Sequence, residues 1–400
     1  MVPNGWNFKE LAEVCSKPIS YGIVQTGSEV NEGIPCVRVV DLTKQKLKTS
    51  EMILTSQEIH QSYKKTILQK NELMMALRGE IGLIRIVTDN LVGINITRGI
   101  ARLAPKINDI DPNYLLWAMR SSHVKNDLMR KAGGSALQEI ALTALRKVKV
   151  PVPPLPEQRK IAKILSTWDK AISTTERLID NSKQQKKALM QQLLTGKKRL
   201  LDDSGKPFEG VWEEVKLKEC ATCLDNKRVP LNSSQRQEMQ GEIPYWGANG
   251  IVDYVNEHIF DETIVLLAED GGYFDEFSHR PIANISYGKS WVNNHAHILK
   301  AKNNSLNEWL YYSLVHKNIL AFINGGTRAK LNKSDMLLIP INLPPIAEQT
   351  KIVGVLGNAD QEISLLENQL ADLKQEKKAL MQQLLTGKRR VKIDNKECVA

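Results

Sequence analysis

The sequence predicts an α+β protein with two globular domains of mixed helix and strand, separated along the chain by two long helices that form an antiparallel coiled coil. Residues 186–197 return unchanged as residues 377–388. The alignment runs back without a gap to residues 155–158 and 346–349, so each copy spans one whole helix. Two longer segments, which share landmarks but little identity, complete a pseudo-twofold internal repeat.

The ends of each long helix are well marked. Pro156 and Glu157 suit the first turn of a helix. The backbone N–H that proline lacks has no partner within the helix at that position, and the carboxylate lies at the positive end of the helix dipole. Gly196 and Gly387 are suited to the left-handed conformation that ends a helix. A helix from Glu157 to Leu194 would be about 57 Å long at 1.5 Å per residue.

Apolar residues alternate at spacings of four and three in both helices, which indicates a coiled coil. Lys186 and Lys377 fall in the same seam, where a lysine either fixes the register, reaches a partner protein or lies at the rod end with its stem on apolar surface. A domain is too small to carry the chain back along the rod and its termini lie close together, so the helices should run antiparallel. The predicted interface residues are Leu165, Trp168, Ile172, Ile179, Leu189, Leu193, Leu356, Ile363, Leu366, Leu370, Leu373, Leu380 and Leu384.

The two globular segments are interpreted as distant copies of one domain. Each opens near a tryptophan (Trp6, Trp212), contains an Ile-Pro pair and closes with Gly-Gly followed by Ser or Thr. Helical stretches are expected around Tyr114–Met129 and Leu306–Ile319. The predicted boundaries are 1–153 for the first domain, 154–200 for the first helix, 201–344 for the second domain, and 345–400 for the second helix with a charged tail.

Composition restricts the class of protein. The net charge of +10 favours a polyanionic partner, with nucleic acid first and an acidic membrane surface second. The five cysteines are scattered and odd in number, as expected in a reducing cytoplasm. The chain lacks a secretory signal at its start and any apolar run long enough to span a bilayer, so we expect a cytoplasmic protein without a membrane partner.

With these features, the chain resembles the specificity (S) subunits of type I restriction–modification systems. The resemblance covers essentially the whole chain. It rests on the duplicated Pro-Pro-Leu-Pro-Glu-Gln and Pro-Pro-Ile-Ala-Glu-Gln segments at 153–158 and 344–349, the Leu-Leu-Thr-Gly-Lys helix ends, and the segments 93–102 and 288–297.

This resemblance implies two target-recognition domains, each reading one half of a bipartite double-stranded DNA sequence. The helical pair would serve as a spacer and would dock two adenine-methyltransferase (M) subunits. Restriction (R) subunits, joined through M, would add ATP-driven translocation and cleavage. S-adenosylmethionine, ATP and Mg²⁺ would then belong to the partners.

The motifs of the partner enzymes are absent from this sequence. It contains no Asn/Asp-Pro-Pro-aromatic tetrapeptide, no Gly-x-Gly-x-x-Gly loop and no Gly-x-x-x-x-Gly-Lys-Ser/Thr loop. We therefore expect no catalytic residue and no bound cofactor in this chain.

Three possible metal or catalytic motifs have simpler interpretations. Cys220 and Cys223 have zinc-like spacing, but no second Cys/His pair lies near them in the sequence. His295 and His297 would share one face of a strand and suit packing or DNA contact, and Asp270 before two glycines is typical of a turn. No metal site is predicted.

Glycine-bounded polar loops are the predicted DNA contacts, because the backbone can approach phosphate closely there. Arginine suits guanine and asparagine suits adenine, although a charged loop residue is often simply solvated. The candidates are Arg78, Arg98, Ser135, Gln138, Lys289, Asn293, Asn294, Thr327, Arg328, Lys330 and Asn332.

The prediction is a non-catalytic DNA reader with an asymmetric, gapped target, whose half-sites lie about one helical turn (34–36 Å) apart. One alternative is a coiled-coil scaffold that does not touch DNA. The other is the recognition half of a free-standing restriction–modification enzyme.

Overall fold

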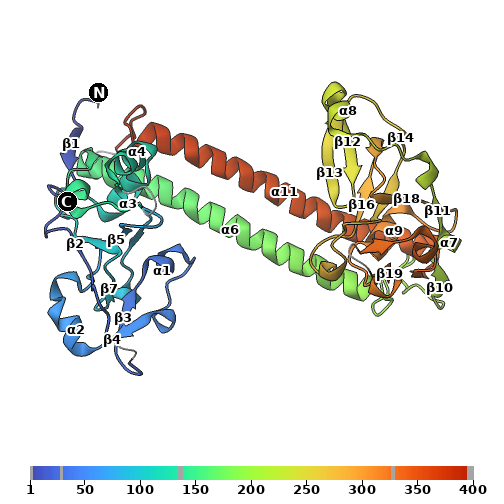
Figure 1. The fold of residues 1–400 in the computed structure, drawn as a ribbon, viewed down its shortest axis with the longest axis horizontal. Helices are drawn as coiled ribbons and strands as arrows, with labels where there is room; N and C mark the ends of the chain where they lie inside the picture. The colour runs from blue at the N-terminus through green and yellow to red at the C-terminus, as the bar shows by residue number, and fades with distance from the viewer. Residues whose placement is uncertain (1–2, 28–29, 134–137, 326–328, 394–400) are drawn as a thin grey trace. The chain divides into compact units, whose positions relative to one another are not determined.

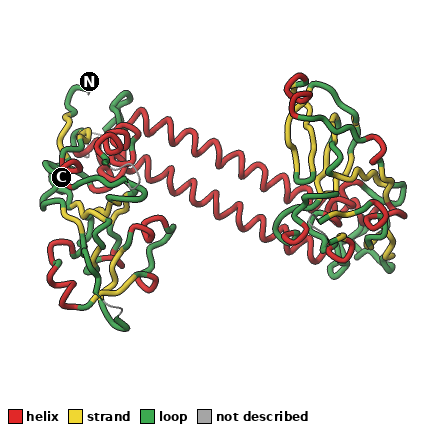
Figure 2. The backbone as a smooth tube through the Cα atoms, viewed as in Figure 1, coloured by secondary structure: helices red, strands yellow, loops and turns green. Residues whose placement is uncertain are grey.

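The structure is a computed structural model in which residues 3–27, 30–133, 138–325 and 329–393 are described. The chain forms two compact units, residues 1–176 with 368–400 (unit 1) and residues 177–367 (unit 2). Each unit holds one domain of mixed helix and strand together with part of each long helix (Figures 1 and 2). The predicted fold class, α+β with two mixed domains and a helical pair, is confirmed.

The domain of unit 1 precedes the first long helix, α6 (Leu155–Leu193). Short strands alternate with short helices along it. Its elements are β1 (Asn7–Glu10), β2 (Ser20–Tyr21), β3 (Ile34–Val37), α1 (Val39–Thr43), β4 (Ile53–Thr55), α2 (Gln57–Ser62), β5 (Leu73–Ala76), β6 (Ile84–Ile86), β7 (Asn95–Ile96), β8 (Ile100–Leu103), α3 (Pro112–Arg120), α4 (Ser122–Lys131), α5 (Leu142–Arg146) and β9 (Lys149–Val152).

The domain of unit 2 precedes the second long helix, α11 (Ile346–Leu384). Its elements are β10 (Glu213–Lys216), α7 (Leu217–Cys220), β11 (Ala221–Cys223), α8 (Ser233–Glu238), β12 (Gln240–Gly247), β13 (Gly250–Val255), β14 (Phe260–Asp261), β15 (Ile264–Ala268), β16 (Ala283–Ser286), β17 (Lys289–Val292), β18 (Ala296–Ala301), α9 (Asn307–Leu314), β19 (Ile323–Asn324), β20 (Lys330–Leu331), α10 (Lys333–Met336) and β21 (Pro340–Leu343).

The sheets of the two domains have matching strand order. The order β2-β8-β5-β6 in unit 1 corresponds to β11-β18-β15-β16 in unit 2, and β4-β3-β7 corresponds to β13-β12-β17. In both domains the third sheet pairs the first strand with the last, β1 with β9 and β10 with β21. The two domains are therefore copies of one fold, as the shared landmarks predicted.

The aromatic side chains of α3 and α9 pack in two settings: Tyr114 and Trp117 lie in the unit 1 core, and Trp309 lies against Leu193 and Ile352 of the long helices. The side chains of Tyr114, Trp117 and Trp309 are buried, and the Tyr114 hydroxyl donates to the carbonyl of Pro151 at 2.8 Å. The helical stretch expected around Tyr114–Met129 is present and consists of two helices, α3 and α4. Ser121 has extended dihedral angles, and its hydroxyl accepts from the Val124 amide at 3.3 Å, so it caps α4 and ends α3.

Within each unit the two long helices run antiparallel. In unit 1, Lys374 pairs with Glu176 at 2.8 Å and Lys377 pairs with Asp169, so later residues of α11 meet earlier residues of α6. In unit 2, Lys183 pairs with Glu367 at 2.7 Å, and the pair Lys186–Asp360 gives the same polarity. After the helices, Gly196 and Gly387 have φ angles of +69° and +71°, the expected left-handed stop.

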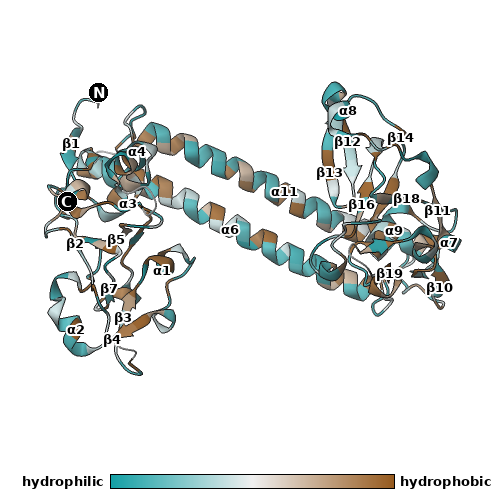
Figure 3. Cartoon of the chain, viewed as in Figure 1, coloured by the Kyte–Doolittle hydropathy of each residue, from teal (hydrophilic) through white to brown (hydrophobic). Residues whose placement is uncertain are grey.

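The apolar seam is best buried where each helix meets a domain. Leu165 and Leu193 of α6 and Leu356 and Leu384 of α11 are 0–3 % exposed. Leu366, Leu370 and Leu373, nearer the middle of α11, are half-buried. Figure 3 shows hydrophobic residues scattered among mostly hydrophilic ones along both helices.

The seam lysines pair inside their own unit. Lys377 lies 4.6 Å from the centre of the Trp117 ring beside Asp169, and Lys186 lies 5.4 Å from the centre of the Tyr312 ring beside Asp360. The same lysine–aspartate–aromatic arrangement therefore occurs twice, so both lysines help to hold a domain against the helical pair.

A second duplicated cluster, the Trp–Glu–Arg clasp, holds the start of each domain. It consists of Trp6, Glu157 and Arg390 in unit 1, and of Trp212, Glu348 and Arg199 in unit 2. In unit 1 the indole Nε1 donates to the buried Glu157 carboxylate at 3.1 Å, and Arg390 donates two bonds of 2.7 Å. In unit 2 the indole donates at 2.9 Å and Arg199 at 2.5 and 2.8 Å.

The buried glutamine after each clasp glutamate ties the helix start to the domain. Gln158 Nε2 donates to the carbonyls of Pro153 and Asp109 at 2.7 and 3.0 Å, and its Oε1 accepts from the Asp111 amide at 2.8 Å. Gln349 makes the matching bonds in unit 2. The repeated Glu-Gln pair therefore has a packing role in both units.

Candidate nucleic-acid interface

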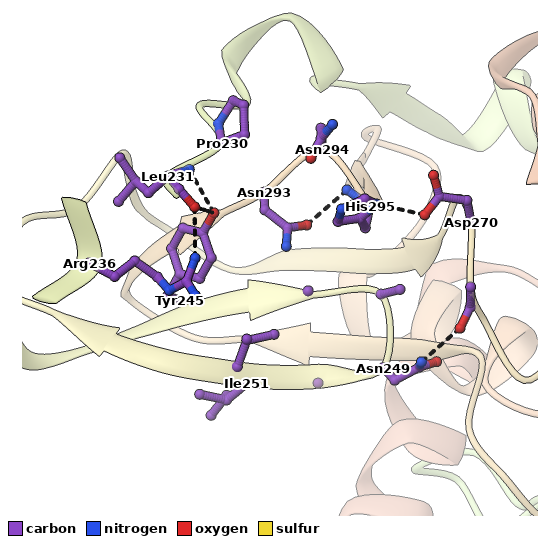
Figure 4. A pocket seen from close by; sticks show the side chains of 15 residues that line it. Pro230, Leu231, Arg236, Tyr245, Asn249, Ile251, Asp270, Asn293, Asn294 and His295 are labelled. Carbon is purple, nitrogen blue, oxygen red and sulfur yellow. Dashed lines mark hydrogen bonds and ion pairs between the residues drawn. The ribbon is translucent and has the colours of Figure 1, made fainter. Parts of the chain in front are cut away.

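A polar pocket of about 470 Å³ lies in unit 2 where two parallel strands end (Figure 4). Strand β12 ends at Gly247, and Asn293 follows β17 directly. The turn between β12 and β13 and the loop after β15 complete its walls. Convergence of several backbone turns on one cavity is a common setting for ligand recognition.

Hydrogen bonds fix the polar groups of this pocket. Asn293 Oδ1 accepts from the backbone amide of His295 at 2.8 Å, while His295 Nδ1 lies 2.6 Å from Asp270 Oδ1. Asn249 donates to the Gly271 carbonyl at 2.8 Å. Arg236 is held by Asp253 at 3.0 Å and by the Leu231 carbonyl at 2.7 Å, which leaves its guanidinium less free for a ligand.

Unit 1 contains a cavity of about 500 Å³ at the ends of β3 and β7, which are also parallel. Three arginines, Arg38, Arg78 and Arg98, line it. Arg38 is held by Asp41 through bonds of 3.1 and 3.0 Å, whereas Arg78 and Arg98 are exposed. Among the residues described, neither of these two guanidiniums has a hydrogen-bond or ion-pair partner.

The two pockets occupy equivalent positions. Val37 is paired with Ile96 in unit 1 and Trp246 with Val292 in unit 2, which aligns Thr97 with Asn293. The backbone amide of Thr97 donates to the Val37 carbonyl, and that of Asn293 donates to the Trp246 carbonyl, both at 3.0 Å. The two residues therefore occupy the same place in the ladder of each strand pair.

A second sheet gives the same alignment. Ala76 pairs with Ile100 and Ala268 with Ala296, so Arg98 matches Asn294 and Arg78 matches Asp270. Two independent registers therefore agree on which residues correspond.

The described residues that follow the predicted Gly-Gly loops bond to the backbone next to Arg78 and Asp270, which line these pockets. The Ile140 amide donates to the Leu77 carbonyl at 2.9 Å, and the Leu331 amide donates to the Glu269 carbonyl at 2.7 Å. Gln138 and Lys330 are exposed, and Lys330 Nζ lies 3.0 Å from Glu269. Ser135, Thr327 and Arg328 lie outside the described residues, so these three contacts stay predictions.

The pockets include only some of the remaining candidates. Arg78, Arg98, Asn293 and Asn294 line them, whereas Lys289 begins β17 and so lies at the other end of that strand. Asn332 caps the short helix α10 and donates to Asp335 at 3.3 Å.

Two lining residues were missed at the sequence level, Arg38 and Asn249, whereas His295 had been interpreted as suited to packing or DNA contact. The shared Ile-Pro pair was the available signal. Aligning Pro35 with Pro244 places Arg38 opposite Gly247 and Val40 opposite Asn249.

The possible metal motifs fold apart. Cys220 Sγ approaches the Leu217 carbonyl, while Cys223, Asp225 and His297 come together. His297 Nδ1 lies 2.7 Å from Asp225 and Nε2 lies 2.8 Å from the Leu331 carbonyl, so both ring nitrogens have protein partners.

Burial raises the pKa of the Cys223 thiol to about 11, and the buried Asp225 has a lowered pKa because His297 and the Ile298 amide bond to it. In the described residues this cluster is therefore a hydrogen-bonded support for the backbone at Leu331.

Comparison with known proteins assigns the class. Residues 3–182 and 209–375 match the family described as "Type I restriction modification DNA specificity domain". The chain therefore belongs to this family, the DNA sequence-recognition subunits of type I restriction–modification systems, and the resemblance drawn from the sequence is confirmed.

Individual relatives agree with this assignment. The chain is 26 % identical to the putative MjaX specificity subunit of Methanocaldococcus jannaschii, over 98 % of this chain and 95 % of the relative. It is 40 % identical to the putative specificity subunit S.HindORF215P of Haemophilus influenzae, but over only 38 % of each chain.

Solved structures share the fold. The S subunit from M. genitalium superposes with a TM-score of 0.64 at 17 % identity, over 96 % of this chain and 98 % of that one. A chain from a study of complex assembly and conformational transition of the type I R-M system gives a TM-score of 0.57 at 19 % identity, over 97 % and 100 %. Among the described residues, no helix is long and apolar enough to cross a membrane.

Proposed function

We propose that this chain reads an asymmetric, bipartite double-stranded DNA target, one half-site per domain, and catalyses no reaction itself. The supporting observation is the pair of equivalent pockets that carry different side chains. A shared scaffold with different reading groups suits a target whose two halves differ. Exposed arginine side chains at the unit 1 pocket and exposed asparagine side chains at the unit 2 pocket match the groups that contact phosphates and base edges.

The helical pair carries a second duplicated feature, a groove beside each domain. The groove has a volume of about 470 Å³ in unit 1 and about 720 Å³ in unit 2. Unlike the pockets, the grooves share the helix residues that line them. The shared pairs are Lys374/Lys183, Lys377/Lys186, Lys378/Lys187, Met381/Met190, Gln382/Gln191, Thr386/Thr195, Asp169/Asp360 and Ile172/Ile363.

Grooves with the same lining suit two copies of one partner. An exposed lysine, Lys187 or Lys378, beside a methionine and an isoleucine favours an amphipathic segment with acidic residues. The proposed occupants are two adenine-methyltransferase (M) subunits, through which restriction (R) subunits join in the cytoplasm.

The partners would supply the chemistry. S-adenosylmethionine would bind M, and ATP with Mg²⁺ would serve the partner subunits. The target adenine would leave the base stack and enter the M pocket. The length of the helical pair would set the gap between half-sites.

Modified-base sequencing of host DNA, with and without the gene, tests this function. We expect methyladenine to disappear from one asymmetric, gapped motif when the gene is removed. An unchanged methylome, combined with failure of the chain to purify with a methyltransferase subunit, would refute the proposal.

A further inference from the structure

The reading groups at matched positions of the two pockets differ in hydrogen-bonding character. Arg98 corresponds to Asn294, and Arg78 corresponds to Asp270. A guanidinium only donates hydrogen bonds, whereas an asparagine amide both donates and accepts. Matched positions on one scaffold therefore offer different partners to a base edge.

In unit 1 the backbone near Arg98 is fixed while its side chain is free. The Arg98 amide donates to the Ile23 carbonyl at 2.7 Å, and the Thr97 hydroxyl donates to the Val37 carbonyl at 3.1 Å. The exposed Arg98 guanidinium has no protein partner in the part of the chain that the structure describes.

Arg78 is directed by packing against the same turn. A side chain at Gly99 would place its Cβ 3.0 Å from Arg78 Nε and 2.8 Å from Val39 Cγ2. The glycine therefore leaves room for Arg78 to lie across the turn that carries Arg98. Two donor-only groups that have no partner among the described residues lie on one cavity, and they match the O6 and N7 acceptors that guanine presents in the major groove.

In unit 2 the corresponding backbone is fixed as well. Arg228 Nη1 donates to the Asn294 carbonyl at 3.3 Å, and Asn293 Oδ1 holds the His295 amide. The Asn294 side chain is exposed, and its amide group has no protein partner among the described residues. Figure 4 shows Asn293 and Asn294 on the turn beside His295.

The electrostatic setting of unit 2 also differs. Arg236, which lines the pocket, is already paired with Asp253, and Asp270 stands where unit 1 has Arg78. An amide, which both donates and accepts, matches the N6 and N7 groups of adenine.

We infer that the two pockets read different bases: Arg98, supported by Arg78, reads a guanine in one half-site, and Asn294 reads an adenine in the other. This assignment rests on the proposed function, in which each domain reads one half-site. It names the specificity-determining residue of each domain.

The test uses the full chain assembled with its own methyltransferase subunits, and maps methylated motifs in cells that lack other methyltransferases. We expect Arg98→Gln and Arg98→Lys to relax one guanine position of one half-site, with discrimination falling about 5- to 150-fold, as for loss of a bidentate contact. Asn294→Ala should relax one adenine position of the other half-site only.

Matched controls isolate the effect. Arg130→Gln and Asn303→Ala change exposed residues away from both pockets and should leave the motif unchanged. Because Arg98→Lys keeps the charge, it would preserve a simple phosphate contact but lose two-bond reading of guanine.

The outcomes separate the two proposals. If the wild-type complex methylates no gapped motif, the proposed function fails. If it does, and the Arg98 and Asn294 variants methylate the same bases, whether or not overall affinity falls, the base assignment is overturned. Thermal unfolding of each variant checks that the fold is retained.

Discussion

Single residues hold each domain to the helical pair, and the clasp glutamates offer the most direct test of this. Glu157 and Glu348 are buried, and each accepts from one tryptophan and one arginine. A buried carboxylate is tolerated because three donors satisfy it. Removing it leaves a guanidinium and an indole N–H without their partner.

We expect Glu348→Ala to lower the unfolding free energy of unit 2 by about 3 kcal/mol, the low end for broken buried pairs. Glu157→Ala should cost less, because the Arg390 side chain is 43 % exposed and Arg199 only 23 %, so Arg390 is rehydrated more easily. Chemical denaturation measures both, with the exposed Glu238→Ala as control. Equal losses for all three variants would show that the clasp contributes nothing specific.

The sequence predicted the helix ends at which these residues lie, but not the contacts that the residues make. The helix-end rules explained Glu157 as a carboxylate at the positive end of its helix. The structure instead pairs Arg199 with Glu348 and Arg390 with Glu157, partners 149 and 233 residues apart. Local rules identify helix ends, but partners this distant depend on how the chain folds back.

At the scale of elements, some parts of the internal repeat are the same in both copies and others differ. The helix residues that line the grooves are the same in both copies, whereas the strand ends that form the pockets differ. Periodicity was enough to predict α6 and α11, because a long apolar seam is a strong signal. The short strands β3 and β7 carry no comparable signal, so the pockets were only partly predicted.

The grooves offer a direct test of partner docking. Lys187 and Lys378 are exposed groove residues at the same position of the repeat. We expect Lys187→Glu with Lys378→Glu to reduce methyltransferase binding at least tenfold, because two charge reversals oppose an acidic segment. Either single variant should bind one copy rather than two, as measured by native mass spectrometry.

The control is a double variant with the same change in charge, Lys46→Glu with Lys206→Glu, at two exposed residues outside the grooves. If the control pair weakens docking as much as the groove pair does, net charge rather than the grooves governs assembly.

At the scale of the whole molecule, the two long helices are continuous from one unit into the other, since each has residues in both. In the proposed function their length sets the gap between half-sites. Insertion of one heptad into each helix adds about 10.5 Å, or roughly three base pairs of DNA length. Methylome sequencing should show a longer gap with unchanged half-sites; altered half-site bases would contradict this role.

The constant grooves and variable pockets have a consequence for how new specificities arise. Each domain begins and ends on one antiparallel strand pair, β1 with β9 or β10 with β21, so its two junctions with the rest of the chain lie together. In the proposed function, a recombination event that exchanges the segment between those junctions would join a new DNA-reading domain to unchanged partner grooves. Under the same proposal, exchange of a whole domain would require no compensating change in the methyltransferase and restriction subunits.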